Sequence, residues 1–216
     1  MMWASLVLLW LVGSCSVALT AADKASYHHG VGFEYEHIFT AGARHTCFVN
    51  SSRLLCWGDC ELDNCHPPEG GYRAVDAGYW HTCAIDSKEM GLCWGGGYAL
   101  QEGAPPMEEV VSVSAGFSHS CAILKRDSSV QCWGYQFPKD SVPTGRYTSV
   151  SAGNQITCAI REDDSALACW GSNEWGQAVP PAGQFVSVSC GGSHCCALGV
   201  DGVGVCWGGS DNFLNG

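Results

Sequence analysis

Cysteine and histidine recur in a fixed order along this chain, and both side chains can do chemistry. One copy of the pattern, HTCAIDSKEMGLCWG, begins at His81 and contains Cys83 and Cys93. Thiol and imidazole groups at this spacing suit a zinc site, a cysteine nucleophile activated by histidine, or a disulfide beside a structural histidine. Four further copies are HTCFVNSSRLLCWG from His45, HSCAILKRDSSVQCWG from His119, ITCAIREDDSALACWG from Ile156 and HCCALGVDGVGVCWG from His194.

The recurrence itself argues against the first two kinds of chemistry. A zinc site needs four converging ligands, whereas each histidine begins a different repeat. A cysteine nucleophile needs a free thiolate, whereas every cysteine of the pattern recurs with a second cysteine. Ile156 takes the place of the histidine in the fourth copy, so the pattern does not depend on an imidazole. We therefore predict structural disulfides, histidines hydrogen-bonded in the core, no metal or cofactor site, and no enzyme activity.

Two β-strands must position each cysteine pair. The residues around the cysteines alternate or are β-branched, which is typical of strands. The separation of the two cysteines varies only from 9 to 11, so the change in length falls in the turn. Directly opposed residues of an antiparallel hairpin lie close enough for a disulfide. The predicted pairs are Cys47 with Cys56, Cys83 with Cys93, Cys121 with Cys132, Cys158 with Cys169, and Cys196 with Cys206.

Four further cysteines complete an even set. The chain has 15 cysteines, and removal of Cys15 with an N-terminal leader leaves 14. Cys195 and Cys196 are adjacent on one strand and point to opposite faces, so only one of them can face Cys206, and repeat alignment selects Cys196. The remaining pairs that we expect are Cys190 with Cys195, on neighbouring strands, and Cys60 with Cys65, in the loop GDCELDNC.

A repeat of about 37 residues organises most of the chain. Its glycine recurs in steps of 36, 38, 37 and 38 residues, at Gly42, Gly78, Gly116, Gly153 and Gly191. Each unit shows three strands, with room for a fourth in a proline-bearing connection, which is typical of a β-propeller blade. We predict an all-β propeller of about five blades. The expected limits are 1–22 for a signal peptide, 23–33 for a linker and 34–216 for the propeller, with repeats 34–71, 72–108, 109–146, 147–183 and 184–216.

The repeat resembles a known family. The pattern V-S-V-S-A-G-x-x-H-T-C-A-I, the C-W-G that follows it and the GSNEWGQ of residues 171–177 are similar to the regulator of chromosome condensation repeat. That resemblance implies a propeller, commonly of seven blades, so the chain is alternatively a fragment of a larger ring. It also implies an alternative function, guanine-nucleotide exchange or chromatin binding. The paired cysteines are more similar to the extracellular repeats of plant crinkly-type receptor kinases.

The N-terminus and the composition favour an extracellular protein. Residues 3–12 form an apolar run followed by small residues, as in a secretory signal, with an uncleaved anchor as the alternative. An oxidising compartment would keep the cysteines paired, and Asn50 begins a glycosylation sequon. The net charge is −11 with only 10 Lys and Arg, which argues against a nucleic-acid partner because phosphate binding needs cations.

Candidate contact residues lie where the repeats differ. Repeat proteins keep their strands in the wall and place variable connections at the faces, here residues 59–66, 96–103, 135–140 and 172–177. The irregular aromatic residues are Trp80, Tyr98, Tyr135, Phe137 and Trp175. With an acidic rim they suit a basic or amphipathic partner. We predict a secreted monomer that binds an extracellular protein or peptide and has no membrane span when mature; the alternatives are an enzyme inhibitor or a lectin-like propeller that binds carbohydrate.

Overall fold

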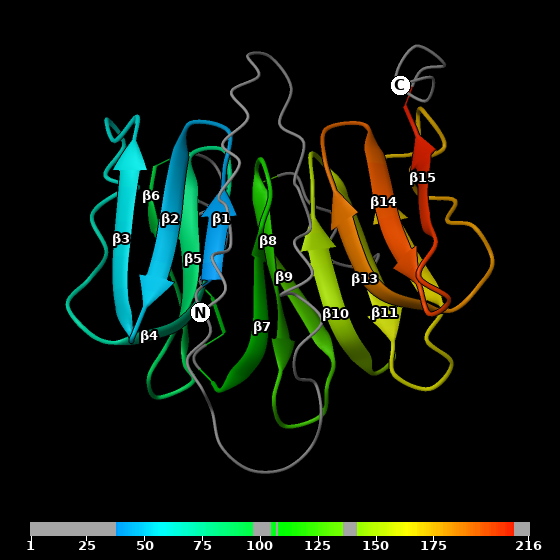
Figure 1. The fold of residues 1–216 in the computed structure, drawn as a ribbon, viewed down its shortest axis with the longest axis horizontal. Helices are drawn as coiled ribbons and strands as arrows, with labels where there is room; N and C mark the ends of the chain where they lie inside the picture. The colour runs from blue at the N-terminus through cyan, green and yellow to red at the C-terminus, as the bar shows by residue number, and fades with distance from the viewer. Residues whose placement is uncertain (1–37, 97–104, 107, 136–141, 210–216) are drawn as a thin grey trace, which may run out of the picture. The chain divides into compact units, whose positions relative to one another are not determined.

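The described part of the chain consists of β-strands. The computed structural model describes residues 38–96, 105–106, 108–135 and 142–209, so the expected signal peptide and linker lie outside it. These residues form five three-stranded antiparallel sheets (Figure 1). Within them no helix is long and apolar enough to cross a bilayer. The strands are β1 (Ile38–Ala41), β2 (His45–Asn50), β3 (Arg53–Gly58), β4 (Tyr72–Ala77), β5 (His81–Asp86), β6 (Gly91–Gly95), β7 (Val110–Ala115), β8 (His119–Leu124), β9 (Val130–Gly134), β10 (Tyr147–Ala152), β11 (Ile156–Arg161), β12 (Leu167–Gly171), β13 (Phe185–Cys190), β14 (His194–Gly199) and β15 (Gly204–Gly208).

Each sheet corresponds to one sequence repeat. Its three strands lie in chain order, so every sheet is a simple meander in which the second strand is central. We call the sheets blades 1 to 5, with β1–β3 in blade 1 and β13–β15 in blade 5. The predicted all-β propeller architecture is therefore confirmed, with three described strands to a blade. The fourth strand that the repeat length allowed is not present among the described residues.

Disulfides hold the hairpins together. The structure contains seven, and they join the pairs that the sequence predicts. Cys83 and Cys93 are directly opposed in the β5–β6 register, with their Cα atoms 4.1 Å apart. Cys190 and Cys195 oppose each other in the same way on β13 and β14. Opposed residues of a non-hydrogen-bonded pair are the closest neighbours in an antiparallel sheet, which is why a short side chain such as cysteine can bridge them.

Apolar side chains fill the boundaries between consecutive blades. At the first boundary, Cys47, Val49 and Leu54 of blade 1 pack with Val75 and Trp94 of blade 2. Equivalent clusters fill the next three boundaries. The tryptophan after the second cysteine is buried in blades 2 to 5, but Trp57 of blade 1 is 50% exposed. No preceding blade covers Trp57 in the described chain, so its surroundings differ although its place in the repeat is the same.

The repeated glycine permits close approach of consecutive blades. A Cβ atom on Gly42 would lie 2.2 Å from the carbonyl oxygen of Gly78, and one on Gly116 would lie 2.4 Å from that of Gly153. Real Cβ atoms do not approach backbone this closely, so a side chain at either position would push the blades apart. The 36- to 38-residue glycine spacing therefore records a contact between neighbouring repeats.

Blades 1 and 5 do not close on each other. In Figure 1 they lie at opposite ends of the row of blades, and no hydrogen bond joins them among the residues that the structure describes. The described blades thus form an open arrangement, in which the outer face of each terminal blade has no neighbouring blade among the described residues.

Candidate functional site: the turn edge

One edge of the blades collects the segments in which the repeats differ. The first and third strands of each meander run in the same direction, so the first turn and the connection to the next blade emerge at the same edge, at the top of Figure 1. We call this the turn edge; its turns are residues 42–44, 78–80, 116–118, 153–155 and 191–193. The hairpin tips, such as residues 51–52, lie at the opposite edge. Variable loops over a rigid wall are the usual place for binding residues.

Aromatic side chains meet across the turns of neighbouring blades. The ring centroid of Tyr79 lies 4.5 Å from that of Trp80 and 4.5 Å from that of Phe117 in the next blade. The guanidinium carbon of Arg44, from the preceding blade, lies 4.4 Å from the Trp80 centroid. We call Arg44, Trp80, Tyr79 and Phe117 the aromatic strip. All four side chains remain at least partly exposed.

Sequence reasoning found only one member of this strip, Trp80. It missed Tyr79, Phe117 and Arg44, although the signal was present in the two residues between the repeat glycine and the histidine position. Those two residues read AR, YW, FS, NQ and GS in the five repeats, so they vary while their flanks do not. What the sequence could not show is that Tyr79 and Phe117, 38 residues apart, lie in contact.

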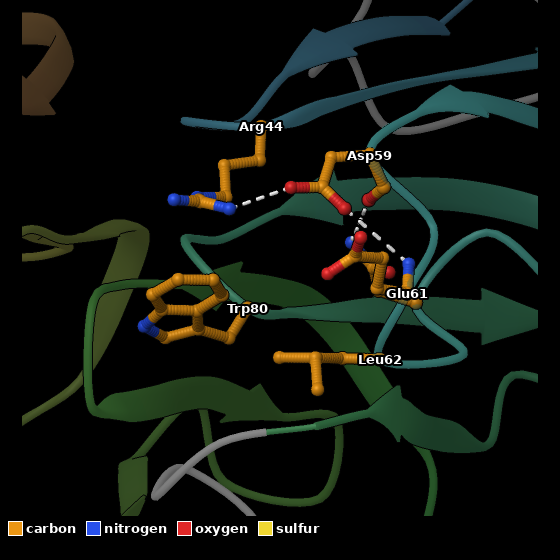
Figure 2. Close-up of a pocket in the computed structure, with 6 residues that line it drawn as sticks. Arg44, Asp59, Glu61, Leu62 and Trp80 are labelled. Atoms are coloured by element: carbon orange, nitrogen blue, oxygen red, sulfur yellow. Dashed lines mark hydrogen bonds and ion pairs between the residues drawn. The ribbon is translucent and has the colours of Figure 1, made fainter.

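An ion pair fixes the first member of the strip. Arg44 Nη1 lies 2.6 Å from Asp59 Oδ2, as Figure 2 shows. The backbone N–H of Glu61 and the Arg44 guanidinium both donate to the Asp59 carboxylate, which lowers the pKa of that carboxyl. The same hydrogen bond raises the pKa of Arg44. Both groups are charged at neutral pH, so Asp59 balances the charge of Arg44, and Glu61 leaves the rim acidic.

The connection after blade 1 is a rigid support for this ion pair. Cys60 and Cys65 close its loop, and the Asn64 side-chain amide donates to the Asp59 carbonyl at 3.1 Å. The Asn64 carbonyl in turn accepts hydrogen bonds from Trp94 Nε1 and the Thr82 hydroxyl. The hollow beside Arg44, Asp59 and Trp80 measures only about 20 Å³, which is room for one water molecule rather than for a ligand. The strip is therefore a surface for contact, not a small-molecule pocket.

The connection after blade 4 docks in the same manner. The Gln177 carbonyl accepts from Trp207 Nε1 at 2.9 Å, just as Asn64 accepts from Trp94. The Gln177 side-chain oxygen accepts a hydrogen bond from the backbone N–H of Trp175 at 2.8 Å, and Trp175 is 52% exposed. A hollow of about 370 Å³ lies beside it, lined by Asn154, Gln155, Ser172, Glu174, Trp175, Gln177, Gly192 and Ser193.

The repeated histidines of blades 1 to 3 are structural. His45 Nε2 lies 2.7 Å from the Thr82 hydroxyl of the next blade, and that hydroxyl donates to the Asn64 carbonyl, so the imidazole must be the donor. His81 makes the equivalent contact with Ser120 at 2.7 Å. Burial away from water lowers the pKa of His81 to about 4, with a smaller contribution from His45. A neutral, buried imidazole that bonds the next blade is unavailable to a substrate.

Ile156 replaces the histidine where the next blade offers no hydroxyl. The position that faces it in blade 5 is Cys195, and Ile156 and Cys195 belong to one buried apolar cluster. Cys195, Cys158 and Cys190 bring their sulfur atoms within 4.8 Å of one another. All three are disulfide-bonded, so none offers the thiolate that a metal would need.

The five predicted contact residues fall into four groups. Trp80 belongs to the aromatic strip, and Trp175 is exposed over the boundary between blades 4 and 5, so these two do not form one site. Tyr135 is partly exposed, and its backbone N–H donates to the Ser118 carbonyl at 2.9 Å. Tyr98 and Phe137 lie outside the described residues.

A known family of repeats matches two of the five blades. The family model described as the regulator of chromosome condensation (RCC1) repeat matches residues 110–137 and 147–177, in blades 3 and 4 and the connections after them. These two blades are thus similar to RCC1 repeats. No curated protein sequence matches it at a significant level.

Several solved structures are similar to this chain over most of its length. The ectodomain of the Physcomitrella patens receptor kinase CR4 is 26% identical, with a TM-score of 0.67, over 79% of this chain and 49% of that one. The CRINKLY WD40 ectodomain of the Arabidopsis thaliana receptor kinase ACR4 is also 26% identical, with a TM-score of 0.65, over 79% of this chain and 62% of that one. Prp20p of Saccharomyces cerevisiae, at 17% identity and a TM-score of 0.64 over 80% of this chain and 57% of that one, shares the fold. The chain thus spans about half to three fifths of the length of these structures.

Proposed function

We propose that this protein is a secreted, non-enzymatic binding module that presents its turn edge to an extracellular protein or peptide. The observation that carries the proposal is the aromatic strip. Packing does not require aromatic rings at these turn positions, because blades 1, 4 and 5 hold Ala43, Asn154 and Gly192 at the position of Tyr79 and Phe117. Exposed aromatic residues that lie in contact with each other, supported by a rigid loop, are typical of the centre of a protein interface.

The charge of the protein favours a basic or amphipathic partner. The chain carries a net charge of −11, and the one arginine of the strip is already paired with Asp59. Indole and phenol rings bind cations through their faces, as Arg44 demonstrates on Trp80. A partner segment with lysine or arginine next to apolar residues would satisfy both the acidic rim and the rings.

Three further features support an extracellular setting. Seven disulfides would be reduced in a cytosol but persist outside the cell. The plant structures similar to this chain are receptor ectodomains. Asn50 is exposed at a hairpin tip, away from the turn edge, where a glycan would not obstruct binding. The proposal therefore includes a signal peptide over residues 1–22 and a glycan on Asn50.

A carbohydrate ligand is the second candidate, and the hollow beside Trp175 favours it. Its volume of about 370 Å³ lies within the range of ligand pockets. Its lining combines one exposed indole with amide, hydroxyl and carboxylate groups, which suits the apolar face and the hydroxyl groups of a sugar ring.

Capture of partners on the immobilised full chain from extracellular fluid, followed by mass spectrometry, tests the proposal. The affinity of the recovered partner is then measured for the variants Tyr79→Asn and Trp80→Ser. These replacements are chosen because Asn and Ser occupy the two positions in blades 4 and 5 respectively. We expect each variant to weaken binding by about tenfold or more. Val203→Ser, at a hairpin tip 61% exposed on the opposite edge, is the matched control. Undiminished binding by both strip variants would contradict the turn-edge site, and loss with Trp175→Ala alone would favour the hollow.

A further inference from the structure

The contacts between consecutive blades follow one pattern. The first is the histidine contact, from an imidazole to a hydroxyl of the next blade, as in His119 to Thr157 at 2.8 Å. The second is the turn contact, in which a turn N–H donates to the repeat glycine of the next blade. Its four examples are Ala43 to Gly78, Tyr79 to Gly116, Phe117 to Gly153 and Asn154 to Gly191.

A third contact joins the first strands of consecutive blades. A side-chain oxygen of one blade accepts a backbone N–H of the next. The four examples are Ala77 to Thr40 at 3.2 Å, Ala115 to Asp76 at 2.8 Å, Ala152 to Ser114 at 3.0 Å and Cys190 to Ser151 at 2.9 Å. Every blade boundary in the described chain therefore has the second and third contacts, and the first three boundaries also have the histidine contact, always with the same repeat positions as donors and acceptors.

Blade 5 retains the groups that would contact a following blade. The three positions are occupied by the His194 imidazole, the N–H of Gly192 and the Ser189 hydroxyl. None of these three groups has a hydrogen-bond partner among the described residues. Gly191 also remains glycine, although the nearest atom to a Cβ there would be in His194 of its own blade, at 3.3 Å. At the other boundaries this glycine is required by the approaching blade. Blade 5 is thus built for a neighbour that the described chain does not supply.

Blade 1 presents the complementary groups. Thr46 stands at the position of Thr82 and Thr157, the Gly42 carbonyl at that of Gly78, and the Ala41 N–H at that of Ala77. The Thr46 hydroxyl has no hydrogen-bond partner among the residues described, so it is open to an incoming imidazole. Blade 1 therefore offers an acceptor for His194, an acceptor for Gly192 and a donor for Ser189.

The same face of blade 1 exposes apolar side chains. Phe39 is 63%, Leu55 45% and Trp57 50% exposed, and the Phe39 and Trp57 ring centroids lie 6.0 Å apart. Their counterparts in blade 2 are covered by blade 1, with Val75 at 5% and Trp94 at 9%. Burying such a cluster would supply the apolar contact that every other blade boundary has.

We propose that this face binds blade 5 of a second copy of the same chain, head to tail, so that His194 of one copy contacts Thr46 of the other. The hydrogen-bonding groups at the two ends of one chain match each other in number and sense. The ends cannot satisfy each other within one copy in this structure, because blades 1 and 5 lie at opposite ends of the row in Figure 1. The sequence led us to expect a monomer, and the proposal replaces that expectation. Such an interface is heterologous, so each copy has one face of each kind to offer.

Two variants of the full chain, each blocked on one face, test the proposal by sedimentation velocity. Trp57→Arg blocks only blade 1, and His194→Glu blocks only blade 5; both positions are on the surface, so each variant should keep its circular dichroism spectrum and melting temperature. We expect the wild type to form dimers or larger species as its concentration rises. For each variant on its own, the dissociation constant of self-association should be at least about thirtyfold higher than that of the wild type. An equimolar mixture should form a one-to-one dimer, because the intact blade 5 of the first variant meets the intact blade 1 of the second.

The remaining outcomes would overturn the proposal. A wild type that stays monomeric at every concentration rules out the second copy as the occupant. Self-association that survives in Trp57→Arg alone means that copies meet through some other face. A mixture that stays monomeric means that the two faces do not bind each other. Leu55→Arg on the same face replaces the first variant if that one fails to fold, and Trp175→Ala at the turn edge should leave self-association unchanged.

Discussion

The imidazole of His81 lies 2.7 Å from the hydroxyl of Ser120, across the boundary between blades 2 and 3. The two residues are 39 positions apart and both are fully buried. Burial keeps the imidazole neutral, and His119 at the next boundary is in the same position, with its pKa lowered by burial to about 3. The histidine of the His-x-Cys pattern therefore joins repeats to one another.

Acid should destabilise the protein through these histidines. The pKa of His81 is about 4 in the folded protein, against 6.5 for an exposed imidazole. Between these values the unfolded chain binds a proton that the folded chain does not, so the stability present above pH 6.5 is lost as the pH falls towards 4. The loss for His81 alone would be about 3 kcal/mol. The double variant His81→Ile with Ser120→Ala imitates the apolar contact of Ile156 with Cys195. Its melting temperature should depend less steeply on pH than that of the wild type. Parallel curves would contradict this role.

Replacement of Gly116 by alanine should be severely destabilising. The new Cβ would lie 2.4 Å from the Gly153 carbonyl oxygen, so blades 3 and 4 would have to separate. We expect a loss of about 2 kcal/mol or more in the free energy of unfolding, measured by denaturant titration. Gly204→Ala is the control, because no atom lies within 4 Å of a Cβ at that position. Equal stability of the two variants would show that the close approach is unimportant.

The hairpin disulfides should be present in the secreted protein. Peptide mapping without reductant should recover Cys83 linked to Cys93 and Cys121 linked to Cys132. Replacing the second pair by alanine should cost about 3 kcal/mol, because the unfolded chain regains the entropy of an open loop. Free thiols at two or more of the hairpin positions would refute the pairing.

Asn50 should carry a glycan when the chain passes through a eukaryotic secretory pathway. Ser52→Asn removes the sequon, whereas Ser51→Asn keeps it, so only the former should lower the mass of the secreted protein. Both serines have positive φ, of 68° and 47°, and asparagine tolerates that conformation. The two variants should therefore fold equally well, and identical masses would show that Asn50 is not modified.

The spacing of residues was sufficient to predict what lies within one blade. Cys121 and Cys132 face each other because an antiparallel hairpin sets their register locally, and Cys196 was chosen over Cys195 because neighbouring strand residues point to opposite faces. The tryptophan positions illustrate the limit of this reasoning. Trp57 and Trp94 hold the same place in their repeats, but within the described residues only Trp94 has a preceding blade to cover it.

The sequence by itself determined the strands, the hairpins and the cysteine pairs, because these depend on alternation and turn length over about a dozen residues. Only the tertiary structure decided that His81 meets Ser120, that Tyr79 meets Phe117, and that blades 1 and 5 remain apart. Those relationships depend on how far each blade is rotated and displaced from the one before it. The close approach at the repeat glycines and the side chains packed between the sheets set that rotation. The residue pattern within a single repeat does not predict it.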